Sequence, residues 1–143
     1  MSARAQRTAR CSNKDVLIEG YASLFGVEDL SGDVVRAGAF SSRLPHADLP
    51  MLLQHRPGAQ IGRWVRVLED GRGLFVRGLI DGKSATWIAR TGVDGLSIGF
   101  RPQVWTLRPS GGRTLLKIDL VEVSLVAEPM LPTARFTMIS GLE

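Results

Sequence analysis

The segment Gly95-Leu96-Ser97-Ile98-Gly99 places a serine between two glycines, each two positions away from it. Glycine has no Cβ, so backbone, substrate or a neighbouring side chain can approach such a serine closely. A nucleophilic serine needs that access, together with a base that takes its proton. Ser97 is therefore a candidate nucleophile. From the pentapeptide alone, the alternative is a strand interrupted by two glycines, without catalytic meaning.

The same segment matches the G-x-S-x-G pattern of a nucleophile elbow, but its context argues against that fold. An elbow needs a strand, a turn and a helix, with the acid and the histidine following the serine. Here both histidines, His46 and His55, precede Ser97, and residues 100–107 favour a strand that contains Pro102. A chain of 143 residues is also short for an α/β-hydrolase. We therefore reject the elbow interpretation.

His55 is the candidate general base. It follows the apolar stretch of residues 49–54 and precedes the turn signal of residues 56–58. A rigid strand would then hold the imidazole at its end, where functional side chains often lie. His46, in a polar loop, is a weaker candidate. A single histidine at a strand end is more often structural or merely exposed, and that alternative stays open.

Glu122 is the candidate acid. Residues 114–126 alternate as a long strand, with Glu122 and Ser124 on one face and Asp119 on the other. A carboxylate in so apolar a strand needs a hydrogen bond or a charged partner. A histidine N–H is a suitable partner, since fixing the histidine tautomer is the role of the acid in a triad. A salt bridge with Arg101 is the alternative.

The position of the hairpin turn decides how far Glu122 lies from Ser97. A turn centred on the glycine pair 111–112 predicts that Ser97 lies opposite Val126 and that Glu122 lies near Arg101. At roughly 3.3 Å per residue, Glu122 is then ~13 Å from Ser97 along the strand. A triad acid must reach the histidine rather than the serine, so this spacing is compatible with a triad in the order His, Ser, acid.

Turn signals and alternating residues predict a mainly β fold with a few short helices. A short helix is expected at residues 38–44 and another at 84–91, with Ser84 as N-cap and Gly92 as the stop. Residues 70–73 indicate a hairpin. No β-α-β rhythm is present, so we expect a closed or nearly closed antiparallel β-barrel, or a sandwich. The expected strands cover residues 15–25, 49–55, 60–68, 74–80, 96–107, 114–126 and 134–139.

Composition indicates a single globular domain. Hydrophobic residues make up 44% of the chain, and no apolar run reaches the ~18 residues of a membrane span. The single cysteine, Cys11, excludes an internal disulfide and fits a reducing compartment. No cluster of cysteines and histidines has zinc spacing, so we expect no metal and no cofactor.

The basic character of the chain is concentrated at its start. Arg4, Arg7 and Arg10 supply +3 of the net charge of +4. We expect residues 1–13 to form a flexible basic N-terminal arm, and no nucleic-acid binding beyond that arm.

Six short segments, taken in order, resemble the prohead (procapsid maturation) serine proteases of tailed phages and gene transfer agents. The resemblance covers about residues 15–137. It implies a fold like that of the herpesvirus assemblins, a β-barrel serine endopeptidase decorated with helices, formed here by residues 14–140. The segments are Gly20–Phe25 with Asp29, Gly32 and Asp33; Gly38–Phe40; Leu53–His55 followed by Ile61 and Gly62; Gly73–Val76; Gly95–Phe100; and Glu122–Val126 with Pro129.

The resemblance also implies a role for each candidate residue. His55 corresponds to the general base and Ser97 to the nucleophile. Glu122 takes the place of the second histidine of the assemblins and would orient His55. The arginine pair that helps to form the assemblin oxyanion hole has no counterpart in residues 127–131, so we expect a backbone N–H of residues 129–131 there.

The implied activity is endoproteolysis in the assembling procapsid, within the cytoplasm of the bacterial host. The substrates would be the major capsid protein, the scaffold and the enzyme itself, and the enzyme would form a homo-oligomer without a membrane. Two alternatives remain. One is a non-catalytic capsid assembly or scaffolding module that keeps the protease fold. The other is a basic β-barrel that binds nucleic acid through its N-terminal arm.

Overall fold

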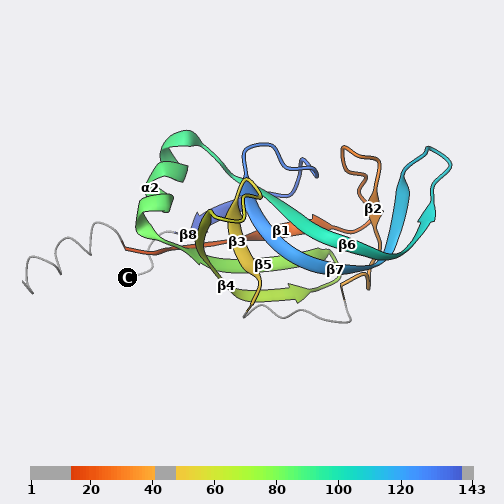
Figure 1. Ribbon diagram of the computed structural model, residues 1–143, viewed down its shortest axis with the longest axis horizontal. Coiled ribbons are helices and arrows are strands. Elements are labelled where there is room, and N and C mark those ends of the chain that lie inside the picture. Colours follow the sequence, from red (N-terminus) through yellow and green to blue (C-terminus); the bar gives the residue numbers. More distant parts are fainter. Residues whose placement is uncertain (1–13, 41–47, 140–143) are drawn as a thin grey trace, which may run out of the picture.

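A computed structural model describes residues 14–40 and 48–139 of the chain. These residues form eight strands and one helix, which confirms the predicted mainly β fold (Figure 1). The expected N-terminal arm, His46 and most of the short helix expected at residues 38–44 lie outside the described residues. No described helix is long and apolar enough to cross a membrane. The elements are β1 (Val16–Leu24), β2 (Val34–Val35), β3 (Pro50–Leu53), β4 (Gln60–Glu69), β5 (Gly73–Ile80), α2 (Gly82–Thr91), β6 (Gly95–Leu107), β7 (Arg113–Val126) and β8 (Phe136–Ile139).

Strand β7 pairs with more strands than any other element of the described chain. It runs antiparallel to β6, and it lies parallel to β2 through residues 114–115 and to β3 through residues 123–125. From β3 the sheet continues in the order β4, β5, β1 and β8. The turn and strand that carry the candidate histidine are therefore attached directly to the strand that carries the candidate acid.

The sheet is strongly curved but not closed, so of the expected closed or nearly closed antiparallel barrel the closed form does not apply, and the word barrel describes the sheet only loosely. Strand β8 and the residues before it return to the start of β6 through the bridge between Gly95 and Arg135, which has two backbone bonds: 2.8 Å from the Leu96 N–H to the Ala134 carbonyl and 2.9 Å from the Phe136 N–H to the Asp94 carbonyl. With four residues, β8 is too short to pair along the thirteen residues of β6. The rest of β6 continues with β7 into a long hairpin that projects at the end opposite α2 (Figure 1). The two parallel pairings of β7 also depart from the expected antiparallel pattern.

The helix begins two residues earlier than its sequence predicts. Asp81, not Ser84, is the N-cap, and its carboxylate accepts a bond of 2.8 Å from the Ser84 N–H. Aspartate suits this position because its side chain satisfies an N–H that has no partner within the helix. Gly92 ends the helix as expected, with a left-handed φ of 77°.

One continuous hydrophobic core ties the strands together. Ile18, Met51, Val76, Leu96 and Leu125 are fully buried and come from five different strands. Burying such a side chain stabilises a fold by about 1.5–3 kcal/mol. The strands that carry the candidate residues are therefore held by the core as well as by their backbone ladders.

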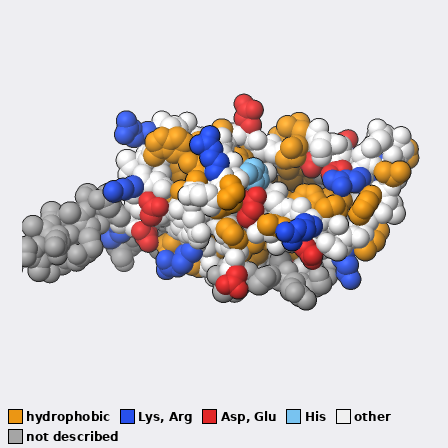
Figure 2. All heavy atoms as spheres, viewed as in Figure 1, with side chains coloured by type: hydrophobic (Ala, Val, Ile, Leu, Met, Phe, Trp, Pro, Cys, Tyr) orange, Lys and Arg blue, Asp and Glu red, His pale blue; other side chains and the backbone are white. Residues whose placement is uncertain are grey.

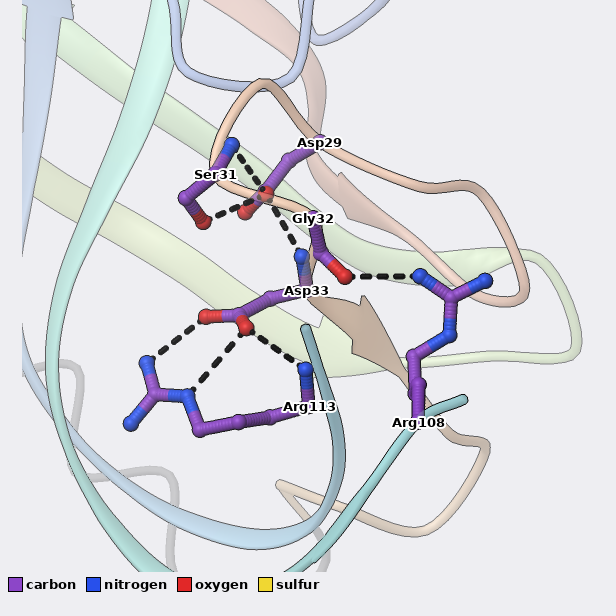
Figure 3. A network of polar contacts seen from close by, with 6 residues as sticks. All are labelled: Asp29, Ser31, Gly32, Asp33, Arg108 and Arg113. Atoms are coloured by element: carbon purple, nitrogen blue, oxygen red, sulfur yellow. Dashed lines mark hydrogen bonds and ion pairs between the residues drawn. The ribbon is translucent and has the colours of Figure 1, made fainter. Parts of the chain in front are cut away.

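The loop between β1 and β2 is organised by the carboxylate of Asp29 (Figure 3). One oxygen of this carboxylate accepts bonds from the Ser31 N–H at 2.9 Å, the Ser31 hydroxyl at 2.6 Å and the Asp33 N–H at 3.0 Å. Aspartate commonly stabilises turns in this way, by bonding its own backbone two residues ahead. The loop therefore has a defined conformation despite its lack of regular structure.

The same loop is fastened to the start of β7. The buried carboxylate of Asp33 accepts bonds from the Arg113 backbone N–H at 3.1 Å and from its guanidinium at 3.2 and 2.6 Å. Arg108, in the hairpin turn, donates to the Gly32 carbonyl at 2.7 Å (Figure 3). Aspartate and arginine are thus used here to fix a loop to a strand.

We predict that the Asp33–Arg113 contact makes stability depend on acid pH. Hydrogen bonds from the Arg113 guanidinium hold the pKa of the Asp33 carboxyl below its ordinary value of 3.8. The contribution is present above the unfolded-state pKa and is lost as the pH falls through the lower folded-state pKa. Asp33→Asn should cost about 1–3 kcal/mol in the free energy of unfolding at pH 7, and the difference from wild type should shrink below about pH 4.

Urea unfolding at pH 7, 4 and 3 measures this difference. Glu19→Gln is the control, because the Glu19–Arg77 ion pair is more exposed and should contribute little. An Asp33→Asn penalty that stays constant down to pH 3 would contradict the assignment.

Candidate active site

The ladder between β6 and β7 brings Ser97 and Glu122 to the same face of the sheet. Ser97 lies opposite Ser124, and Gly99 lies opposite Glu122. Residues that face each other across a ladder, and residues two apart on one strand, point to the same side. Glu122 is therefore one step diagonal to Ser97.

This pairing corrects the expected register by two residues. The turn spans Arg108 to Gly112, with the Arg108 N–H bonded to the Gly112 carbonyl at 2.7 Å, so its centre is Ser110 rather than the glycine pair. Arg101 lies opposite Asp119 and not near Glu122. The correction brings the acid closer to the serine than the ~13 Å expected from sequence.

The two glycines around Ser97 make room for specific neighbours. A Cβ at Gly99 would lie 2.2 Å from Oε2 of Glu122, and a Cβ at Gly95 would lie 2.6 Å from Cδ of Pro129. Both distances are shorter than any real contact of this kind, so a side chain at either position would displace its neighbour. The neighbours that approach these glycines are Glu122 and Pro129, which explains why glycine stands at both positions without an elbow.

The turn after β3 presents His55 in an unusual backbone conformation. Gln54 and His55 both have left-handed φ angles, of 55° and 60°, which cost roughly 1–2 kcal/mol per residue for side chains with a Cβ. Two bonds of Gln54 hold the turn against the end of β7. Its N–H donates to the Leu125 carbonyl at 2.9 Å, and its side-chain oxygen accepts from the Ala127 N–H at 2.8 Å.

His55 and Glu122 are directly hydrogen-bonded. Nδ1 of His55 lies 2.7 Å from Oε2 of Glu122, and the side chains are 42% and 13% exposed. A carboxylate accepts hydrogen bonds, so Nδ1 is the donor, and in a neutral imidazole Nε2 is then the acceptor. Figure 2 shows a histidine side chain at the surface, with hydrophobic side chains and an acidic side chain beside it. The contact of Glu122 is therefore with His55, and the alternative salt bridge with Arg101 is absent from the described residues.

His55 and Ser97 both line the same cavity, of about 270 Å³, called here the main cavity. Ser97 is 8% exposed. Most of the lining is apolar, and the loop between β1 and β2 supplies one wall. The apolar lining consists of Ala22, Leu24, Val27, Val35, Leu96, Ile98, Phe100, Leu115, Met130 and Leu131.

A shallower depression, called here the side cleft, also reaches both residues. It is bordered by Gln54, Val126, Ala127, Glu128 and Met130 in addition to His55 and Ser97. The Leu30 N–H donates to the Met130 carbonyl at 2.9 Å, so the loop after β7 is tied to the loop between β1 and β2. Residues of both loops therefore line the cavities that Ser97 also lines.

This arrangement brings together three side chains of the types used in acyl transfer: a serine, a histidine and a carboxylate. A serine with limited exposure lines a cavity together with a histidine whose tautomer is set by a carboxylate. Among residues 14–40 and 48–139, no group of three potential ligands is placed to hold a metal ion.

Two residues at this site were not found from the sequence. Ser124 donates its hydroxyl to Oε1 of Glu122 at 2.5 Å, and Gln54 fixes the histidine turn. The alternation of β7 had placed Ser124 on the face of Glu122, which was the available signal. Gln54 belongs to the segment Leu53–His55 of the family resemblance, but no role was assigned to it, because its contacts depend on the parallel pairing of β3 with β7.

Known proteins are similar to this chain in sequence and in fold. The prohead protease of Enterobacteria phage HK97 is 33% identical over 109 residues, which cover 68% of this chain and 48% of that protein. The chain thus spans about half the length of the curated relative it matches.

The structural likeness is to herpesvirus proteases and shows the fold alone. The KSHV protease in complex with a hexapeptide phosphonate inhibitor gives a TM-score of 0.65 at 16% identity, covering 90% of this chain and 66% of that chain. The varicella-zoster virus protease gives 0.55 at 14% identity, covering 90% and 65%. The expected assemblin-like fold is confirmed. A family model described as caudovirus prohead serine protease matches residues 3–141, and the chain therefore belongs to the caudovirus prohead serine protease family.

Proposed function

We propose that this chain is a serine endopeptidase that cleaves capsid or scaffold protein during procapsid maturation, with Ser97, His55 and Glu122 as its catalytic residues. The observation that carries the proposal is the 2.7 Å bond between His55 and Glu122 beside a cavity that Ser97 also lines. Family membership supports the protease class.

In the proposed mechanism, Ser97 attacks the scissile carbonyl while Nε2 of His55 takes its proton. The histidine then returns that proton to the leaving amine. Water next attacks the acyl-enzyme and gives a proton to His55, which passes it to the departing Ser97 oxygen. Glu122 holds the imidazole in place and stabilises the imidazolium that forms. The oxyanion needs N–H donors. Within residues 129–131 we assign them to the backbone N–H groups of Met130 and Leu131, because Met130 lines both the main cavity and the side cleft. Pro129 has no backbone N–H.

The substrates proposed are the major capsid protein, the scaffold and the enzyme itself. Cleavage would take place inside the assembling procapsid, in the cytoplasm of the host, with the enzyme as a homo-oligomer. The related phage protein is named a prohead protease, which supports this location.

The main cavity supports a preference for a large apolar side chain next to the scissile bond. Its lining is mostly apolar, and Asp33, its buried acid, is already paired with Arg113. A charged side chain would lose its hydration against the apolar part of this lining, which an apolar side chain would not.

We predict that Ser97→Ala abolishes cleavage of the cognate major capsid protein. The loss should be at least roughly 10³-fold, because the alanine cannot form the acyl-enzyme. The chain is co-expressed with that capsid protein, and the mass of the capsid protein is then measured. Ser110→Ala, in the hairpin turn, is the control and should cleave normally.

The alternative, a non-catalytic scaffolding module, gives a different outcome. Particles would assemble, and the capsid protein would keep its full mass with wild type and variant alike. That result would contradict the proposal that the chain is an endopeptidase.

Glu122→Gln should reduce the cleavage rate less than Ser97→Ala does. The fold-reduction should be about 10 to 100 times smaller than that of Ser97→Ala. The amide keeps the size of the side chain but loses the charge that stabilises the imidazolium. Asp119→Asn, on the same strand and the opposite face, is the matched control. Single-turnover rates of capsid-protein cleavage measure all three variants. Equal rates for Glu122→Gln and Asp119→Asn would show that Glu122 has no catalytic part.

Val27→Trp should narrow the main cavity and select for smaller side chains. Val27 lines the cavity and is 40% exposed, so a larger side chain can be accommodated without overpacking the core. We expect kcat/KM to fall about tenfold or more for a peptide with leucine before the scissile bond, and less for one with alanine. Val65→Trp, on β4 and 38% exposed, is the control. Equal losses for both peptides would argue against this cavity as the side-chain site.

A further inference from the structure

Ser124 is a buried polar residue next to the acid. It lies on β7, two residues after Glu122, and its side chain is 0% exposed. Its hydroxyl donates to Oε1 of Glu122 at 2.5 Å, while Oε2 of the same carboxylate faces Nδ1 of His55 at 2.7 Å. The two oxygens of Glu122 therefore have different partners.

The backbone of Ser124 is fixed from both sides. It is paired with Leu52 of β3 in parallel and with Ser97 of β6 in antiparallel fashion. A hydroxyl on so constrained a strand has few positions available to it. Gly99, across the ladder from Glu122, leaves the carboxylate the space to turn toward both partners.

A carboxylate oxygen in such a place needs a donor. Leaving a buried acceptor unpaired costs free energy, and the cost is larger for a charged group than for a neutral one. The Ser124 hydroxyl meets this need for Oε1, which leaves Oε2 directed at the histidine.

We propose that Ser124 is a positioning residue for catalysis. Its hydroxyl locks the rotation of the Glu122 carboxylate and shares its negative charge, so that Glu122 can hold His55 in the orientation that serves Ser97. The catalytic part of this inference rests on the proposed endopeptidase function. The part that concerns the His55–Glu122 pair can be tested without any cleavage.

The hydroxyl should also set the pH at which the pair takes up a proton. The Glu122 carboxylate is charged beside a neutral imidazole and beside an imidazolium alike, and donation to its Oε1 draws part of the negative charge away from Oε2, which weakens the attraction of Oε2 for the imidazolium. Without the donor, the state with a protonated imidazole becomes relatively more stable. The midpoint of the imidazole titration should therefore move to higher pH. The charged groups around the pair are Glu128, which borders the side cleft with His55, and Arg56, the next residue along the turn. Asp119 lies on the opposite face of β7, and all three are unchanged in the variants below.

The test compares Ser124→Ala, which removes the donor, with Ser124→Thr, which keeps a hydroxyl. Ile118→Val, a buried position on the same strand, controls for a general loss of packing. Ser124→Ala should lower kcat/KM for capsid-protein cleavage by about tenfold, as expected for the loss of a hydrogen bond to a charged group. The acid limb of its pH profile should shift upward, and Ser124→Thr should restore part of both properties. Ile118→Val should leave the pH profile in place.

A second measurement separates this inference from the proposed function. The His55 imidazole is titrated by NMR in the folded wild type, Ser124→Ala and Ile118→Val. A higher midpoint only in Ser124→Ala supports the positioning role, even if no preparation cleaves a substrate. A lack of cleavage in every preparation counts against the proposed endopeptidase function and not against the positioning role. An identical midpoint in wild type and Ser124→Ala overturns the inference. If Ser124→Ala does not fold, Ser124→Cys, which keeps the size and weakens the donor, takes its place in both measurements.

Discussion

The ladder between β6 and β7 is the constraint on which the site depends. It places Ser97 opposite Ser124 and Gly99 opposite Glu122, so the candidate nucleophile and acid share one face. The same strand β7 pairs in parallel with β3, and Leu53 faces Leu125 two residues before the histidine. One central strand therefore positions His55, Ser97 and Glu122, although they are far apart in the sequence.

Close packing at this ladder is accompanied by backbone strain in the turn after β3. Gly99 lacks the Cβ that would collide with Glu122, which lets the acid turn across the strand toward His55. On the other side, Gln54 and His55 adopt left-handed backbone angles that side chains usually avoid. The bonds from Gln54 to Leu125 and Ala127 offset this cost and deliver the imidazole to the acid. Residues at functional sites often hold such conformations when the surrounding structure fixes them.

The wall of the main cavity is built by polar residues that take no part in the proposed chemistry. Asp29 shapes the loop between β1 and β2, and Asp33 fastens it to Arg113 at the start of β7. The loop is also bonded to the segment after β7 through Leu30 and Met130. Acidic residues that belong to the sequence resemblance thus act in loop structure, and the cavity they support remains mostly apolar.

The sequence by itself determined the mainly β fold, the hairpin at residues 70–73, the family and the three candidate residues. These features depend on local alternation, turn residues and short motifs, and each of those is formed by residues that are close together in the sequence. The tertiary structure decided the register of β6 with β7, the open form of the sheet and the roles of Ser124 and Gln54. Register depends on where a five-residue turn is centred, and a shift of two residues changes every facing pair while leaving the alternation intact. The contacts of Gln54 depend on a parallel pairing between strands about seventy residues apart, and no pattern within either strand specifies its partner. The bond from Ser124 to Glu122 lies within β7, where alternation indicates a shared face but not the contact itself.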